Sequence, residues 1–179
     1  MKTHPCDVIK YCLRCGSRDF KTNDRGHSFN CGKCHFKYFI NNAAAVACLI
    51  FNDEGKLLLT RRAMDPSKGM LDLPGGFVEP DESAESAIIR EIWEELGVKV
   101  TKAEYLVSFP NEYVYSGISV FTLDLAFICV VDDLSGVVPA DDVLSIEYIL
   151  PGEIKTEELC SESMANIIGQ YIDKYPRLY

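Results

Sequence analysis

The chain has 179 residues, of which 47% are hydrophobic and 11% aromatic, and its formal net charge is −9. This length leaves room for one ordinary domain and a small appendage, and the hydrophobic content favours a folded core over disorder. The acidic balance argues against binding of duplex nucleic acid, and the sequence has neither an apolar run of about 18 residues nor a signal-peptide core. We therefore expect a cytoplasmic protein with no membrane span and no nucleic-acid partner.

Two pairs of cysteines stand near the N-terminus. Cys12 and Cys15 are separated by two residues, as are Cys31 and Cys34, and 15 residues lie between the pairs. This spacing is typical of a structural zinc site with four thiolate ligands. Two disulfides or a redox-active pair are the alternatives, and a reducing compartment disfavours the disulfides. A segment this short cannot fold by apolar burial alone, so we predict that Zn²⁺ folds residues 1–40.

The second domain is expected over residues 41–179. Residues 43–51 have the pattern of a buried strand, and residues 56–61 that of its hairpin partner. Arg61 and Arg62 are adjacent, so a strand would point them to opposite faces. One of them could reach a substrate phosphate, and ordinary solvated arginines at a strand end are the alternative.

Residues 83–96 have the start and stop signals of one helix. Asp81 or Ser83 is a plausible N-cap, and Gly97 follows the last turn. At 3.6 residues per turn, the apolar residues predicted to share one face of this helix are Ile89, Ile92, Trp93 and Leu96.

Three carboxylates gather on another stripe of the same helix, from Glu91, Glu94 and Glu95. Like charges at i, i+4 oppose helix formation by roughly 0.2–0.5 kcal/mol per pair, and Arg90 alone is close enough to relieve them. A divalent cation such as Mg²⁺ would remove the repulsion, because hard ions bind carboxylate and phosphate oxygens. A solvated acidic face is the alternative.

The rest of the chain is predicted to add strands and one more helix. Residues 99–109 form a strand that ends in a turn at Pro110 and Asn111, and residues 118–131 form a central strand. A short last strand covers residues 146–150. A C-terminal helix covers residues 157–171 and is expected to bury Leu159, Ala165, Ile168 and Tyr171.

The spacing from Gly76 onward is distinctive: five residues, Glu82, seven residues, then REIWEELGV over residues 90–98. It resembles the Nudix box, GX5EX7REUXEEXGU with U aliphatic, and every fixed position matches. The resemblance implies an α+β fold, an α/β/α sandwich with a mixed sheet, and hydrolysis of a nucleoside diphosphate linked to another moiety, with Mg²⁺ or Mn²⁺. It implies metal binding by Glu91, Glu94, Glu95 and the Gly76 carbonyl, support from Glu82, and an Arg90 that orients Glu91.

Further catalytic roles are less fixed by the resemblance. Glu91 could also serve as general base. Nudix enzymes often use one more acid outside the box, and we favour Glu147 for it, with Asp141 and Asp142 as competitors.

The cysteine segment resembles the zinc ribbon that precedes the Nudix domain in NADH pyrophosphatases. That group carries SQPWPFPxS after the box, whereas this chain has SFPNEYVYSG, which counts against NADH specificity. Tyr113 and Tyr115 could stack on a purine, as in dinucleoside polyphosphate hydrolases, or could simply cover a core. The predicted substrate is a nucleoside diphosphate derivative such as NADH, NAD, ADP-ribose or a dinucleoside polyphosphate.

In the enzyme, we expect the ribbon to be a structural accessory and a candidate contact in a homodimer. Two other functions compete with this one. One is a non-catalytic nucleotide sensor, although such sensors often lose box glutamates and none is missing here. The other makes the ribbon an interaction module for nucleic acid or protein, against which the acidic balance counts.

Overall fold

The computed structural model of the protein describes residues 3–23 and 25–176. The chain divides into two compact units. The N-terminal unit comprises residues 1–43 together with residues 112–121, and the second unit comprises residues 44–111 and 122–179. The inclusion of residues 112–121 in the N-terminal unit is not apparent from the sequence.

The N-terminal unit contains a short helix and a three-stranded antiparallel sheet in the order β1-β2-β3. Its elements are α1 (Pro5–Val8), β1 (Phe20–Thr22), β2 (Ser28–Cys31) and β3 (Lys37–Phe39). Phe20 and Phe29 stack with ring centroids 4.8 Å apart and are buried with Cys12 and Cys31. This core is small, as expected of a unit that needs a further stabilising element.

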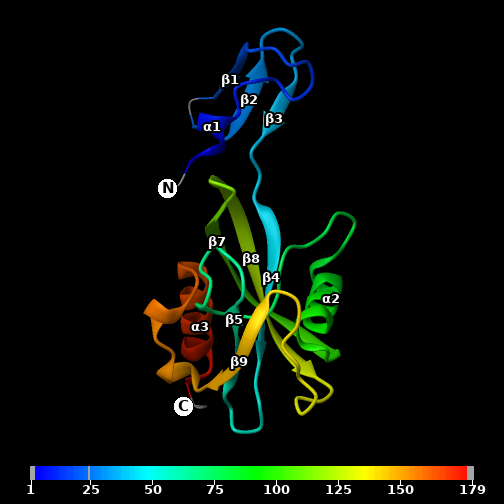
Figure 1. The fold of residues 1–179 in the computed structure, drawn as a ribbon, viewed down its shortest axis with the longest axis vertical. Coiled ribbons are helices and arrows are strands. Elements are labelled where there is room, and N and C mark those ends of the chain that lie inside the picture. The colour runs from blue at the N-terminus through cyan, green and yellow to red at the C-terminus, as the bar shows by residue number, and fades with distance from the viewer. Residues whose placement is uncertain (1–2, 24, 177–179) are drawn as a thin grey trace. The chain divides into compact units, whose positions relative to one another are not determined.

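The second unit is built on two three-stranded sheets, in the orders β4-β8-β7 and β6-β5-β9. The strands are β4 (Ala43–Ile50), β5 (Leu57–Arg62), β6 (Leu71–Asp72), β7 (Val100–Tyr115), β8 (Ile118–Val131) and β9 (Val143–Ile149). The other elements are α2 (Ala84–Leu96), two 3-10 turns, η1 (Pro151–Glu153) and η2 (Thr156–Glu158), and α3 (Glu162–Lys174). Figure 1 shows α2 and α3 on opposite sides of the strands.

Alternating residues of the strands divide the core into two layers. On β4, Ala47 and Leu49 pack in the cluster that contains the buried face of α3, whereas Cys48 and Ile50 pack in the cluster that contains α2. On β5, the side chains at 57 and 59 face α3 and the one at 58 faces α2. The predicted α/β/α sandwich is therefore confirmed. None of the helices in the described part of the chain is long and apolar enough to span a membrane.

The helix expected over the box is confirmed with both of its caps. The Ser83 side chain accepts a hydrogen bond from the Ser86 N–H, and Gly97 ends the helix with a φ of 69°. The predicted buried face, however, was partly wrong: Ile89 and Trp93 are each 55% exposed. The buried side chains of α2 are instead Ala87, Ile88, Ile92, Glu95 and Leu96.

Two predicted connections differ in the structure. Residues 43–51 and 56–61 are joined by the Phe51–Leu57 bridge at the turn, but β4 and β5 belong to different sheets and are not hairpin partners. The strand predicted to end before Pro110 continues through it to Tyr115, and the chain turns at Ser116 and Gly117 with φ of 51° and 78°. Proline is tolerated there because β7 is the edge strand of its sheet.

The C-terminal helix begins later than predicted. Ser161 caps α3 by accepting from the Met164 N–H, and the preceding residues form η1 and η2. Of the predicted core residues, Leu159, Ile168 and Tyr171 are buried, while Ala165 is partly buried.

Candidate active site

The loop before α2 brings its backbone against both β4 and the helix. The Val46 N–H donates to the Gly76 carbonyl at 2.8 Å. A Cβ on Gly75, whose φ is 141°, would lie 2.2 Å from the Val46 carbonyl oxygen, and a Cβ on Gly76 would lie 2.6 Å from a carboxylate oxygen of Glu91. Position 75 therefore needs glycine, because its near neighbour is backbone, whereas at position 76 the near neighbour is the end of the Glu91 side chain, whose carboxylate lies directly against the loop.

Arg90 joins three of the box carboxylates. Its guanidinium donates twice to Glu82, with Nε at 3.0 Å and Nη2 at 2.9 Å from the carboxylate oxygens. Nη1 donates to Glu91 at 2.8 Å and to Glu94 at 3.0 Å, and Nη2 also reaches the Phe77 carbonyl. One positively charged atom thus lies within hydrogen-bond distance of both Glu91 and Glu94. The Glu82 oxygens contact Arg90, and this contact agrees with the expectation that Glu82 supports the site.

The third acid of the helix lies inside the protein. Glu95 is only 6% exposed, and its carboxylate accepts a hydrogen bond from the Gly75 N–H at 3.0 Å. Burial raises the pKa of Glu95 to about 9, and repulsion from Asp142 and Glu91 adds to the effect. Burial also raises the pKa of Glu91 above its ordinary value, against the opposing effect of Arg90. This crowding of buried carboxylates is what a bound cation would relieve.

A small pocket opens beside Glu95. Arg62 and Asp72 form an ion pair at 2.8 Å in its wall, and Asp142 contributes another carboxylate. The full lining is Thr60, Arg62, Asp72, Leu73, Gly75, Glu95, Asp142 and Val143. Sequence reasoning missed Asp72, although an acidic residue between two leucines just before the paired glycines was a usable signal.

Glu147 lies on the other face of the strands. In the β5–β9 register it stands directly opposite Leu59, whose side chain faces α3, so Glu147 also faces α3. There it is hydrogen-bonded to Arg61, which also contacts Glu158 at 3.6 Å and the Gly69 carbonyl at 2.8 Å. The structure therefore brings Asp142, and not Glu147, to the box carboxylates.

The two arginines separate as the sequence predicted. Arg62 lines the pocket on the α2 side, and Arg61 belongs to the ionic cluster on the α3 side. Tyr113 and Tyr115 belong to the N-terminal unit, where their rings stack with centroids 6.4 Å apart. A role for these tyrosines in substrate binding stays a prediction.

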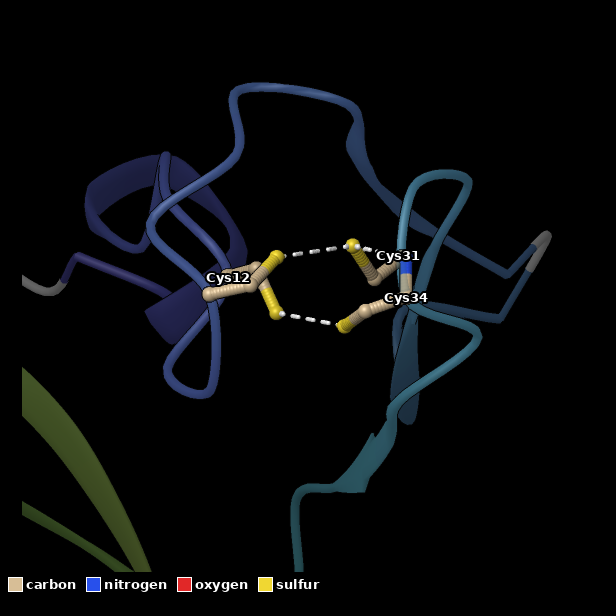
Figure 2. Close-up of side chains that lie close together, drawn as sticks. Cys12, Cys31 and Cys34 are labelled. Atoms are coloured by element: carbon tan, nitrogen blue, oxygen red, sulfur yellow. Dashed lines mark hydrogen bonds between the residues drawn. The ribbon is translucent and has the colours of Figure 1, made fainter.

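The four N-terminal cysteines converge from two tight turns (Figure 2). Their Sγ atoms all lie within 4.8 Å of one another, with Cys12 and Cys34 at 3.7 Å and Cys15 and Cys31 at 3.6 Å. Sulfurs bound tetrahedrally at about 2.3 Å from Zn²⁺ would be about 3.8 Å apart, so the cluster has the size of a zinc site. A hydrogen bond from the Cys34 N–H lowers the pKa of Cys31 to about 7, which favours the thiolate that metals bind.

These features are an α/β/α sandwich, a group of carboxylates at one helix and a cluster of four cysteines, and comparison with known proteins gives the family. The NUDIX domain model matches residues 41–166, so the chain belongs to the Nudix family.

Several curated relatives share parts of the sequence. The NAD-capped RNA hydrolase NudC of Vibrio atlanticus is 26% identical over 166 residues, which are 92% of this chain and 61% of the relative. The CTP pyrophosphohydrolase of Escherichia coli is 43% identical over 68 residues, covering 37% of this chain and 50% of that protein. The ADP-ribose pyrophosphatase of Methanocaldococcus jannaschii is 44% identical over 63 residues, covering 35% and 37%. The chain thus spans about half the length of the curated relatives it matches.

Solved structures agree on the fold. A NUDIX hydrolase from Nitrosomonas europaea superposes with a TM-score of 0.64 at 24% identity, over 93% of this chain and 92% of that one. The MutT NUDIX hydrolase from Burkholderia pseudomallei superposes with a TM-score of 0.63 at 21% identity, over 73% of this chain and 98% of that one. At these identities the comparison supports the fold alone.

Proposed function

We propose that this protein is a Mg²⁺- or Mn²⁺-dependent hydrolase of a pyrophosphate bond in a nucleoside diphosphate derivative. The observation that carries the proposal is the bonding of Arg90 to Glu82, Glu91 and Glu94, on the helix whose Glu95 lines a pocket together with Asp142. A complete set of box carboxylates favours turnover over sensing.

The donor set suits a hard divalent cation. Glu91, Glu94, Glu95 and Asp142 would hold it with the Gly76 carbonyl, which has a lone pair left beside its bond from Val46. When bound, the metal supplies charge neutralisation on the phosphate oxygens and lowers the pKa of a bound water. Glu82 acts through Arg90 and is a positioning residue.

The remaining chemistry is assigned to the protein's own groups. Water adds to a phosphorus of the diphosphate, one new P–O bond forms, and the P–O bond to the leaving phosphate breaks, so that two phosphate products result. Glu91 is assigned to accept the proton of the water, and its carboxylate, held by Arg90 against the loop, supports this assignment. Asp142 is the proposed metal-binding carboxylate from outside the box. Arg62 lines that pocket and contributes positive charge toward substrate phosphate.

The substrate class follows from what the relatives share. The names of three relatives refer to CTP, ADP-ribose and NAD-capped RNA, and each of these contains a nucleotide joined through a phosphate anhydride. The relative that aligns over 92% of this chain is the NAD-capped RNA hydrolase. We place NAD-type diphosphates first among the candidates, with ADP-ribose and dinucleoside polyphosphates next. The cysteine cluster holds structural Zn²⁺, since four thiolates leave no open position for catalysis.

The test is product chromatography after incubation with Mg²⁺ and a panel of NADH, NAD, ADP-ribose, diadenosine polyphosphates, nucleoside triphosphates and a 5′-NAD-capped oligoribonucleotide. We expect at least one compound to yield two phosphate-bearing products, and the products locate the bond that is cleaved. A parallel reaction without divalent metal should yield none. If no compound of the panel is cleaved with Mg²⁺ or Mn²⁺, but one of the compounds raises the melting temperature of the protein, the protein is a nucleotide sensor and the proposal fails.

A further inference from the structure

The charge of the chain is divided very unequally between its two parts. Residues 1–40 contain eight Lys and Arg against three Asp and no Glu, a formal charge of +5, whereas residues 41–179 contain ten basic and 24 acidic side chains, a charge of −14. The overall value of −9 therefore conceals a basic N-terminal segment. All of its basic residues that the structure describes are exposed: Lys10, Arg14, Arg18, Lys21, Arg25, Lys33 and Lys37.

One face of the ribbon sheet collects part of this charge. Lys21 on β1 stands opposite Asn30 on β2, and Asn30 stands opposite Lys37 on β3. Residues paired in this way have their side chains on the same face of a sheet, and all three are exposed. Phe39, two residues after Lys37, shares the face and is 52% exposed. We call these four residues the open face of the ribbon.

The opposite face of the same sheet is occupied. Phe20 and Cys31 form one pair across β1 and β2, and Phe29 pairs with Tyr38 across β2 and β3. Three of these side chains belong to the buried core that also contains cysteines of the cluster, so this opposite face is covered, whereas the four residues of the open face are exposed.

The open face combines the two features that single-stranded nucleic acids recognise. Lys21 and Lys37 stand two strand spacings apart, about 10 Å, and offer cations to a phosphate backbone, although a phosphate at Lys21 would replace its ion pair with the exposed Asp19 carboxylate at 3.2 Å. The exposed Phe39 ring offers a stacking surface for a base, and the Lys37 ammonium already lies 4.7 Å from the centre of that ring. The Asn30 side chain between the lysines can both donate and accept hydrogen bonds.

We propose that the open face of the ribbon binds single-stranded nucleic acid, with Lys21 and Lys37 on the phosphates and Phe39 stacked on a base. Binding is independent of sequence and sensitive to salt, as expected when phosphate contacts dominate. This goes beyond the proposed hydrolysis and does not rest on it, because the binding surface contains none of the box residues.

The test is fluorescence anisotropy of the zinc-loaded full chain with a labelled single-stranded oligoribonucleotide that has a 5′-hydroxyl and hence no pyrophosphate bond. The charge reversals Lys21→Glu and Lys37→Glu, made together, should weaken binding at least about tenfold and lower the slope of log Kd against log salt by about 1.4, the value for two lost phosphate contacts. Phe39→Ala should weaken binding roughly 5- to 150-fold with an unchanged salt slope, because it removes stacking only.

The matched control reverses two exposed lysines of the second unit, Lys99→Glu with Lys102→Glu, and should bind like the wild type. If the reversals at 21 and 37 lower the zinc content or the melting temperature, Lys21→Gln with Lys37→Gln replaces them. A deoxyribonucleotide of the same sequence distinguishes RNA from DNA as the natural ligand. The proposal is overturned if the wild type binds neither strand at 50 mM salt, or if both pairs of reversals weaken binding equally.

Discussion

Arg90 binds both carboxylate oxygens of Glu82, eight residues earlier in the chain, through two separate nitrogens. The same guanidinium holds Glu91 and Glu94, so it fixes the loop and the helix carboxylates in one geometry. A lysine has one nitrogen and cannot reproduce the paired bonds. We predict that Arg90→Lys lowers kcat about 10- to 100-fold, as expected for a group that orients metal ligands.

The relation between Arg90 and Glu82 can be checked by a double-mutant cycle. If Glu82 acts through Arg90, Glu82→Gln should lower kcat much less in the Arg90→Lys variant than it does in the wild type. Fully additive losses of kcat would show that the two residues act separately.

The acid outside the box is predicted to be Asp142. Asp142→Asn should lower kcat strongly, because this carboxylate lines the pocket with Glu95. Glu147→Gln should leave most of the activity, because Glu147 faces α3 and is bonded to Arg61. Asp141→Asn is the neighbouring control. Steady-state kinetics with one cleaved substrate decides between them, and a larger loss for Glu147→Gln than for Asp142→Asn would reverse the assignment.

Glu95 should make the stability of the protein without divalent metal depend on pH. Its folded pKa is about 9, well above the ordinary 4.5 of an unfolded glutamate, so the folded state holds the proton more tightly. This contribution is fully present below about pH 4.5 and is lost as the pH rises toward 9. Glu95→Gln keeps an acceptor for Gly75 and has no proton to lose, so we predict that its melting temperature exceeds that of the wild type increasingly from pH 5 to 9.

The measurement is thermal unfolding of zinc-loaded protein in buffers from pH 5 to 9 without Mg²⁺. Glu85→Gln, an exposed position on the same helix, should show no such trend. A difference between Glu95→Gln and wild type that stays constant over this range would contradict the buried, protonated Glu95.

The cysteine cluster is predicted to bind about one zinc per chain. Cys31→Ser should lose the metal and unfold the N-terminal unit, because the small core there cannot replace it. Cys6→Ser is the matched control: Cys6 lies in the same unit outside the cluster, and its thiol donates to the Gly26 carbonyl, which a serine hydroxyl can also do. Elemental analysis of protein purified without chelator checks both, and a zinc-free wild type would refute the site.

Much of the fold is readable from the sequence because local signals agree with the tertiary structure. Ser83 and Gly97 mark the ends of α2, and the box spacing identifies the sandwich. The cysteine spacing likewise predicts the cluster found in the structure. Each of these features is local in the chain, so it does not depend on which surfaces later pack together.

The remaining features depend on packing between distant segments. Ile88 and Ile89 are adjacent on α2, and only contact with the strands decides that Ile88 is buried and Ile89 exposed. Asp142 and Glu147 are both plausible partners of the box in sequence, but the β5–β9 register places Glu147 on the α3 side, whereas Asp142 lines the pocket with Glu95. The charge of the ribbon was masked by the overall composition, which the second unit dominates.

The most direct test of the proposed active site compares Glu94→Gln with Glu85→Gln on the same helix. Both remove one negative charge from an exposed glutamate of α2, but only Glu94 is bonded to Arg90 and is proposed to bind metal. Turnover of the substrate identified in the panel, measured across a Mg²⁺ titration, should fall at least about 100-fold in Glu94→Gln and stay near wild type in Glu85→Gln. Wild-type turnover with unchanged Mg²⁺ dependence in Glu94→Gln would contradict the assignment of the box carboxylates as the metal site.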